Sequence, residues 1–305
     1  MNLLSSILYD TVYHSVPLIL AVLGGLFAHK ANVLNIGLEG MMLMGAYSTT
    51  LFVYITGNLW LSVLLGVLVT LALGFVFAFF GVTMKSNVII TGLGINLFAQ
   101  AFSAFMLKYM QLANINVSNI VNVSELKINI PVIEDIPVIG PLLSGHTPIS
   151  YITLILIIVV NIVMFKTRFG VYVRVVGENE EAAKSVGINT TLIKYVAILI
   201  GALLCALAGA NLATERMALF TNNMTAGRGF IAIAAIYCGN AMPLKSTLYA
   251  IIFGLARSLA INLGLFAGPV SGLFEMVPYI MIVVVLSVVS AVETSHRRVR
   301  GFTNG

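Results

Sequence analysis

The chain has 305 residues, of which 59% are hydrophobic and only 9% are charged. Soluble domains carry about 25% charged residues, so this composition excludes a soluble protein and predicts a polytopic membrane protein. The formal net charge of +5 does not indicate nucleic-acid binding, because basic residues in membrane proteins usually mark cytoplasmic loops. We therefore expect one all-α membrane domain over residues 1–305, with membrane lipids and no nucleic acid among its partners.

The sequence lacks the motifs of several enzyme classes. It has no G-x-x-x-x-G-K-[ST] phosphate loop, so we do not expect it to bind ATP itself. It has no H-E-x-x-H motif and no His/Cys cluster that would indicate a metal site. Cys205 and Cys238 lie in apolar runs and are expected to pack as small hydrophobic residues. We predict no catalytic residue, no metal ligand and no resident cofactor.

Apolar runs of the length needed for a membrane helix recur along the chain. A hydrocarbon core about 30 Å thick requires about 20 mostly apolar residues per helix. On that scale the sequence predicts about nine transmembrane helices, within a range of eight to ten. The predicted spans are residues 7–28, 36–56, 60–83, 88–107, 149–165, 195–213, 229–242, 247–266 and 276–292.

The positions of Lys and Arg predict the orientation of these spans. With a cytoplasmic C-terminus, eleven of the sixteen basic residues lie inside and four lie outside, whereas the inverted topology breaks the positive-inside rule. The N-terminus and the loop 108–148 are then external, and the polar loop 166–194 is cytoplasmic. Residues 126–130 of the external loop alternate apolar and polar side chains, which is the pattern of a short strand.

Polar residues and glycines precede the second predicted span, in the order Asn35-Ile36-Gly37-Leu38-Glu39-Gly40. A carboxylate at the membrane boundary is costly, and the glycines permit a tight bend or a close helix contact. Two interpretations stay open here. Asn35 and Glu39 belong either to a broken segment that lines a transport pathway or to a glycine-rich lead-in to the second span.

Further candidate pathway residues lie in the fourth and eighth spans. Asn96 and Gln100 are one helical turn apart and share a face. They form either an interhelical hydrogen bond, worth about 1 kcal/mol, or a contact with a substrate. Arg257 pairs, reaches toward the membrane surface or lines the pathway. Gly227-Arg228-Gly229 weakly resembles the Gly37–Gly40 stretch, which indicates an internal repeat.

The polar loop 166–194 contains the signals of a complete short helix. Asn179 is a good N-cap, two glutamates follow it at the positive end of the helix dipole, and Lys184 lies at the negative end. Gly187 occupies the position of a C′ glycine. A helix of about two turns, roughly 10 Å long, is marginal alone. It is either a surface bump or a peg for a partner, with an exposed apolar face. The residues expected on that face are Ala182, Ala183 and Val186.

These stretches resemble a known family. Gly177-Glu178-Asn179, Ala182-Ala183 and Gly187-Ile188 resemble the cytoplasmic loop of ABC-importer permeases that serve ribose-type sugars, branched-chain amino acids and nucleosides. Asn35 to Ala46 and Gly227 to Ala232 are similar to motifs of the purine-nucleoside branch, and the length resembles the shorter of its two permease subunits. His29 and Asn32 depart from the usual residues before the first of these motifs, where an acidic and a small residue are expected.

The resemblance implies an inner-membrane permease of a bacterial ATP-driven importer. Its implied partners are a separate ABC ATPase that binds the ATP, a second permease subunit in a heterodimer, and a lipoprotein that binds substrate outside. The residues it implies for coupling to the ATPase are Glu178, Asn179, Glu181, Ala182, Ala183, Val186 and Gly187. The alternatives are a ribose-type sugar permease of the same family, an ion-coupled secondary transporter, and a channel or membrane scaffold.

Overall fold

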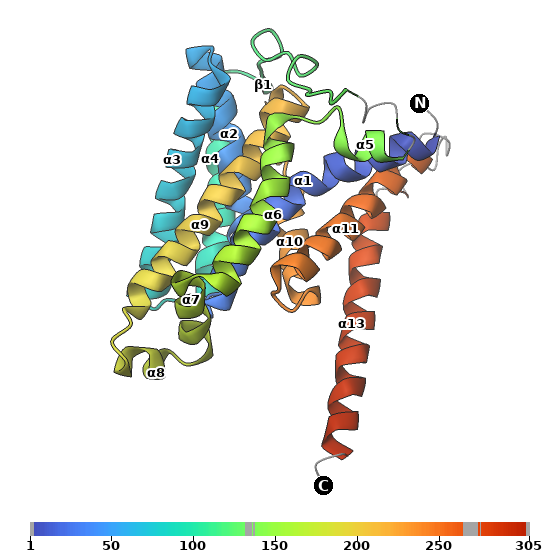
Figure 1. The fold of residues 1–305 in the computed structure, drawn as a ribbon. Helices are drawn as coiled ribbons and strands as arrows, with labels where there is room; N and C mark the ends of the chain where they lie inside the picture. The colour runs from blue at the N-terminus through green and yellow to red at the C-terminus, as the bar shows by residue number, and fades with distance from the viewer. Residues whose placement is uncertain (1–2, 132–135, 137, 265–273, 275, 303–305) are drawn as a thin grey trace.

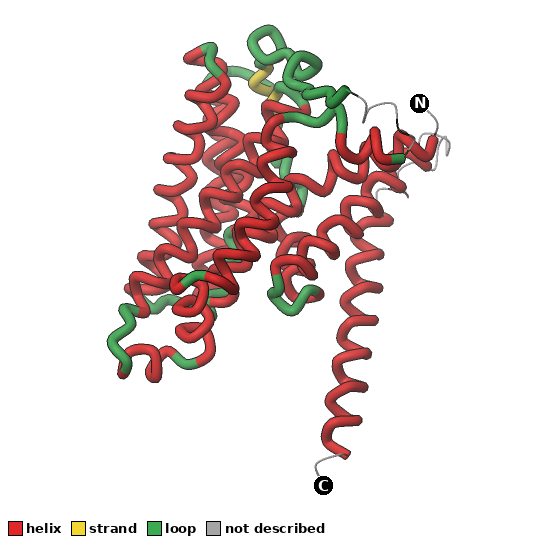
Figure 2. Tube along the Cα trace, in the orientation of Figure 1, coloured by secondary structure: helices red, strands yellow, loops and turns green. Residues whose placement is uncertain are grey.

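The computed structural model describes residues 3–131, 136, 138–264, 274 and 276–302. In this part of the chain the fold is helical apart from one two-stranded ladder (Figures 1 and 2), which confirms the all-α class. The long helices are α1 (Leu3–Lys30), α2 (Leu38–Thr56), α3 (Leu59–Ala78), α4 (Val88–Tyr109), α6 (Pro148–Lys166), α9 (Thr190–Ala210), α11 (Pro243–Gly264) and α13 (Val277–Phe302). The short helices are α5 (Ile139–Leu143), α7 (Arg168–Glu178), α8 (Glu180–Ser185) and α10 (Arg228–Cys238). Two π-helical turns, η1 (Phe79–Thr83) and η2 (Asn211–Arg216), continue α3 and α9.

Six of these helical segments are long and apolar enough to cross a membrane. They are Leu4–Lys30, Leu59–Thr83, Val88–Tyr109, Pro148–Lys166, Thr190–Arg216 and Pro243–Gly264. The predicted nine spans would add α2, α10 and the apolar start of α13. However, α10 has only eleven residues, about 16 Å at 1.5 Å per residue, so it is too short to cross alone. The structure establishes a polytopic helical membrane protein, and the count of nine stays a prediction.

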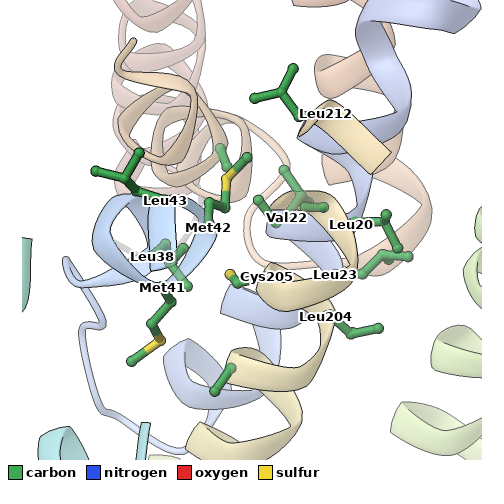
Figure 3. Packing of buried hydrophobic residues seen from close by; sticks show 14 of the residues in the cluster. Leu20, Val22, Leu23, Leu38, Met41, Met42, Leu43, Leu204, Cys205 and Leu212 are labelled. Carbon is green, nitrogen blue, oxygen red and sulfur yellow. The ribbon is translucent and has the colours of Figure 1, made fainter. Parts of the chain in front are cut away.

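The centre of the molecule is formed by α1, α2 and α9, whose buried side chains interlock. Figure 3 shows Leu20, Met42 and Cys205 among the residues of this cluster. Glycines let the backbones approach: a Cβ added at Gly24 would lie 2.8 Å from the carbonyl oxygen of Gly201, and one at Gly209 would overlap the carbonyl oxygen of Met42. Small residues at helix crossings are the usual solution in membranes, where burial of apolar area does not drive association between helices.

The loop between α4 and α6 contains a strand, but not the predicted one. β1 (Asn114–Asn116) pairs antiparallel with β2 (Leu219–Thr221), and the paired Ile115 and Phe220 are fully buried. The predicted strand at residues 126–130 is wrong, because only Ile128 forms an isolated bridge, with His146. Alternation alone is not enough for a strand, since strands need a partner over several residues. Here the neighbouring segment continues into α6.

The opposite end of the molecule from this ladder carries α7 and α8 (Figure 1). Close backbone contacts hold α7 in place. A Cβ at Gly170 would overlap the carbonyl oxygen of Val163 in α6, and one at Gly177 would overlap that of Lys30 at the end of α1. The end of α13 lies toward the same end of the molecule as α8, and the N-terminal end of α1 lies toward the other. Because α7 is fixed to two long helices, α8 projects from a rigid base.

This arrangement makes the predicted topology testable by chemical labelling. Ser118 lies beyond β1 and Ser185 ends α8, and both are exposed. A cysteine placed at each should react with a membrane-impermeant maleimide from opposite sides of the membrane, with Ser118→Cys accessible in intact cells and Ser185→Cys only after lysis. The native Cys205 and Cys238 are buried and provide an unreactive background. Labelling of both engineered cysteines in intact cells would contradict the topology.

Candidate functional site

A cavity of about 410 Å³ lies between α2, α4 and the first turn of α10. Cavities of roughly 300–1,000 Å³ are typical of small-molecule sites. The wall is mostly apolar, with a few polar groups and one aromatic ring. It comprises Glu39, Gly40, Leu43, Leu93, Asn96, Leu97, Gln100, Asn223, Gly227 and Phe230. Three of the five predicted pathway residues, Glu39, Asn96 and Gln100, are therefore brought together here.

Glu39 connects the start of α2 to the start of α10. Its Oε1 accepts a hydrogen bond from the backbone N–H of Gly227 at 2.8 Å, and its Oε2 accepts one from Gly229 at 2.5 Å. These N–H groups belong to a helix N-terminus, which lacks intrahelical acceptors and carries a partial positive charge. The contact requires glycine at 229, because a Cβ there would overlap the backbone of Glu39. The buried carboxylate thus has a structural partner for each oxygen.

The side chain of Asn96 likewise forms hydrogen bonds with the backbone at the start of α2. Its Oδ1 accepts from the N–H of Gly40 at 2.7 Å, and its Nδ2 donates to the carbonyl oxygen of Ile36 at 3.0 Å. Ile36 lies in the turn before α2 and Gly40 in its first turn, where the backbone lacks intrahelical partners, so these groups need a side-chain partner inside a membrane protein. Asn35 is also structural. Its Oδ1 accepts from Gly37 at 3.0 Å within a turn, and the residue does not line the cavity.

Three residues of the cavity wall have no structural role in the contacts described above. They are Gln100, Asn223 and Phe230. The side chains of Gln100 and Asn223 form no hydrogen bond with any described residue, and the ring of Phe230 is partly exposed. The sequence identified Gln100 but missed Asn223 and Phe230. The similarity of Gly227–Gly229 to Gly37–Gly40 was the available signal, since these two stretches meet at Glu39.

Arg257 does not belong to this cavity. It lines a separate, smaller cavity with His14 and Arg228, on the other side of α10. Arg228 and Phe230 are on different faces of the first turn of α10, so the two cavities share a helix but no polar wall. The sequence grouped Arg257 with Glu39 because both are charged residues in apolar runs, and only the fold separates them.

The predicted helix in the loop 166–194 is confirmed as α8. The side chain of Asn179 accepts a hydrogen bond from the N–H of Ala182 at 3.0 Å, as an N-cap should. Gly187 has a φ of +84°, the left-handed conformation that ends many helices. Glu178, Asn179 and Glu181 are exposed beside it. The local signals in the sequence therefore located this helix correctly.

The predicted apolar face of α8 needs one correction. Ala182 is exposed and Val186 is 72% exposed, but Ala183 is fully buried. A short helix that leans on α7 and α9 must turn one side inward, and Ala183 lies on that side. Because α8 is only six residues long, its outward apolar surface consists of Ala182 and Val186, which are four residues apart on one face.

Glu180, which the sequence did not select, anchors α8 to α9. Its carboxylate pairs with Lys184 at 2.7 Å and with Lys194 of α9, and it accepts a hydrogen bond from Thr190 at 3.2 Å. The hydrogen bonds from Lys184 and Lys194 lower the pKa of Glu180 from its usual value to about 2. The Lys184 pair was recognisable as a helical i,i+4 spacing, whereas the Lys194 contact depends on the fold.

A bundle of apolar helices around a cavity, with a short capped helix projecting from one end, defines a polytopic helical membrane permease. The chain belongs to the family described as branched-chain amino acid transport system / permease component, whose model matches residues 7–286. Members are transport permeases and not enzymes. No solved structure matches the chain.

Several curated relatives are similar over most of their length. The chain is 33% identical to the nucleoside ABC transporter permease protein NupC of Lactococcus lactis and 31% identical to the guanosine ABC transporter permease protein NupQ of Bacillus subtilis. Each alignment covers 94% of this chain and 92% of the relative. It is 30% identical to a putative glucose ABC transporter permease protein, TsgC13, of Haloferax volcanii, over 86% of this chain and 79% of the relative.

The contact between Glu39 and α10 can be tested by thermal unfolding of the purified protein. Glu39→Gln removes the charge and turns one acceptor into a donor, which leaves a buried N–H unpaired at about 1–3 kcal/mol. Gly229→Ala should lower the melting temperature further, because its Cβ would overlap the Glu39 backbone. Gly94→Ala is the matched control, since a Cβ there meets nothing within 4 Å. Equal melting temperatures for all four proteins would contradict the assigned contact.

Proposed function

We propose that this chain is the permease subunit of an ATP-driven importer and carries purine nucleosides through the cavity between α2, α4 and α10. The observation that carries this proposal is the combination of two unpaired amides, Gln100 and Asn223, with the ring of Phe230 in one largely apolar cavity. The similarity to permeases named for nucleosides and guanosine supports the same substrate class.

The chemistry of the cavity suits a purine ring. A purine has two apolar faces and an edge of hydrogen-bond donors and acceptors. Phe230 offers a stacking surface, and stacking of a base on an aromatic side chain is worth about 1–3 kcal/mol. Gln100 and Asn223 each carry both an acceptor oxygen and a donor NH₂ group, so they match such an edge. Leu43, Leu93 and Leu97 supply the apolar wall.

A ribose-type sugar is the second candidate substrate within the same class of transporter. The similarity to a putative glucose permease favours it. The cavity favours it less, because a sugar presents hydroxyl groups in many directions, whereas three leucines and a phenylalanine line much of this wall. Burial of hydroxyl groups without hydrogen-bond partners is unfavourable. Uptake measurements with both substrate classes decide between them.

Coupling to ATP hydrolysis is assigned to α8. A separate ATPase subunit would bind ATP and receive α8 in a groove. Val186 and Ala182 would enter that groove, with Glu178, Asn179, Glu181 and Gly187 around them, while Ala183 holds the helix from below. Single exposed apolar residues are common on protein surfaces, so the support for this contact is the resemblance of residues 177–188 to the cytoplasmic loop of ABC-importer permeases. The pairing of Glu180 with Lys194 would transmit force from the ATPase to α9.

The other partners of this permease and its location are inferred from the same family resemblance. We infer a second permease subunit in a heterodimer, a lipoprotein that delivers substrate outside, and a bacterial plasma membrane as the location. The N-terminus is assigned outside and the C-terminus inside, with nine passes through the membrane. The exposed apolar residues of α4 next to the cavity, such as Leu97 and Phe98, would then face lipid or the second permease.

An ion-coupled secondary transporter receives less support. Such proteins use ionisable residues near the membrane midplane as carriers of coupling ions or protons. Glu39 is the carboxylate in the cavity, and both of its oxygens already accept backbone hydrogen bonds. These hydrogen bonds give Glu39 a structural role at the start of α10.

The substrate assignment is tested by uptake in cells. A strain that lacks this protein should lose uptake of radiolabelled guanosine and inosine. Gln100→Leu should restore uptake only with an apparent affinity about 3–10-fold weaker, as expected for loss of one neutral hydrogen bond of about 0.5–1.5 kcal/mol. Thr91→Val, on the same helix outside the cavity, is the control. Normal nucleoside uptake in the deletion strain together with lost sugar uptake would transfer the assignment to sugars.

The coupling assignment is tested by co-purification of the ATPase. Val186→Asp places a charge at the centre of the proposed contact, and a buried unpaired charge costs several kcal/mol. It should release the ATPase and abolish transport while the protein remains folded, because Val186 is exposed. Met84→Asp changes a similarly exposed apolar residue elsewhere and should have no such effect. Retention of both ATPase and transport by Val186→Asp would contradict this role of α8.

A further inference from the structure

A cavity of about 40 Å³ lies behind α10, on the opposite side from the cavity assigned to the substrate. Its polar wall consists of His14 from α1, Arg228 from α10, Arg257 from α11 and Tyr279 from α13. Leu18 and Phe253 contribute apolar surface. The site therefore lies where four helices meet, and two guanidinium groups face it.

The protonation state of His14 follows from its neighbour. Nη2 of Arg216 lies 3.0 Å from Nδ1 of His14, and a guanidinium can only donate. Nδ1 must accept, so the imidazole is neutral and carries its proton on Nε2. Arg216 is held in this position by the ring of Tyr13, 3.5 Å from its Cζ. His14 thus presents its remaining nitrogen as a hydrogen-bond donor.

Positive charge is concentrated around this cavity. Arg228 and Arg257 line the cavity, and Arg216 contacts His14 from outside it. Nη1 of Arg228 donates to the carbonyl oxygens of Met224 and Thr225. Tyr279 donates its proton to the carbonyl oxygen of Ala226 at 3.2 Å. The polar groups that remain for a ligand are therefore mainly donors.

The acidic residues that the structure describes near this cavity form hydrogen bonds elsewhere. Glu39 accepts from Gly227 and Gly229, and Asp10 accepts from Asn262 at 2.7 Å. Glu215 accepts from Asn211 and from the N–H of Ile149. Within the described part of the chain, both ion pairs closer than 4.0 Å belong to Glu180 in the loop 166–194. Cations in a membrane protein pair with charged groups or with backbone carbonyls. Arg228 has carbonyl partners, and no described acidic residue pairs with Arg228 or Arg257.

We propose that the cavity between His14, Arg228, Arg257 and Tyr279 binds a small inorganic anion of the size of chloride. A cavity needs about 10–15 Å³ of free space to hold one water molecule, so about 40 Å³ is large enough for a small ion. The anion would contact Arg228 on one face of the first turn of α10, while Glu39 holds the other face. It would thereby fix α10 beside the substrate cavity, and the site is independent of which substrate is transported.

Thermal unfolding of the purified full-length protein tests this proposal. The melting temperature is measured in sodium chloride, sodium bromide and sodium gluconate at equal ionic strength. Chloride and bromide should raise it saturably, by about 2–4 °C for each kcal/mol of binding energy, and gluconate should not. Arg257→Gln should abolish the halide effect and Arg257→Lys should retain part of it. Arg168→Gln, at an exposed position outside the cavity, should respond like the unchanged protein.

Three results would overturn the proposal. Equal melting temperatures of the unchanged protein in halide and gluconate would show that no anion binds, whether or not Arg257→Gln folds. A halide effect that appears only in Glu275→Gln would show that Glu275, which lies outside the described residues, supplies the counter-charge instead. A full halide effect in Arg257→Gln would place the responsible site elsewhere.

Discussion

The structure depends on one interaction, the contact of the Glu39 carboxylate with the N-terminus of α10. Both of its oxygens accept backbone hydrogen bonds at the positive end of a helix dipole, inside a protein that offers little water. A side chain at position 229 would block the contact. Without a carboxylate at position 39, the backbone N–H groups of residues 227 and 229 would lose their hydrogen-bond acceptors. The contact joins two places where the helical path of the chain is interrupted, one before α2 and one before α10.

The cavity is a consequence of these interruptions. Continuous helices through this level would fill the space with their own backbone and side chains. Non-helical backbone at membrane depth is tolerated where it is buried in protein or lines a water-filled space, and Asn96 satisfies part of it by bonding to Ile36 and Gly40. The polar side chains closest to the interruption before α2 therefore form hydrogen bonds that hold the fold. Gln100, Asn223 and Phe230 line the cavity beside them, and these are the residues that we propose contact the solute.

Local signals in the sequence predicted local structure well, and they failed where distant contacts decide. The cap at Asn179 and the C′ glycine at 187 located α8, because both act on the adjacent backbone. The burial of Ala183 depends on packing of α8 against the rest of the chain, which no spacing within the loop reveals. Likewise, the apolar run 229–242 predicted a full span, but α10 begins at the Glu39 contact and ends after eleven residues. For the same reason the sequence could not show that Arg257 lines a different cavity from Glu39, since that cavity is assembled from four helices.

We propose that ATP hydrolysis by a partner subunit drives nucleoside movement through this chain. The most direct measurement is uptake of radiolabelled guanosine into proteoliposomes that contain the permease pair and its ATPase, with the substrate-binding lipoprotein added outside. We expect uptake that requires ATP at the ATPase and persists when ionophores abolish proton and sodium gradients. Uptake that proceeds without ATP and stops with the ionophores would contradict the account.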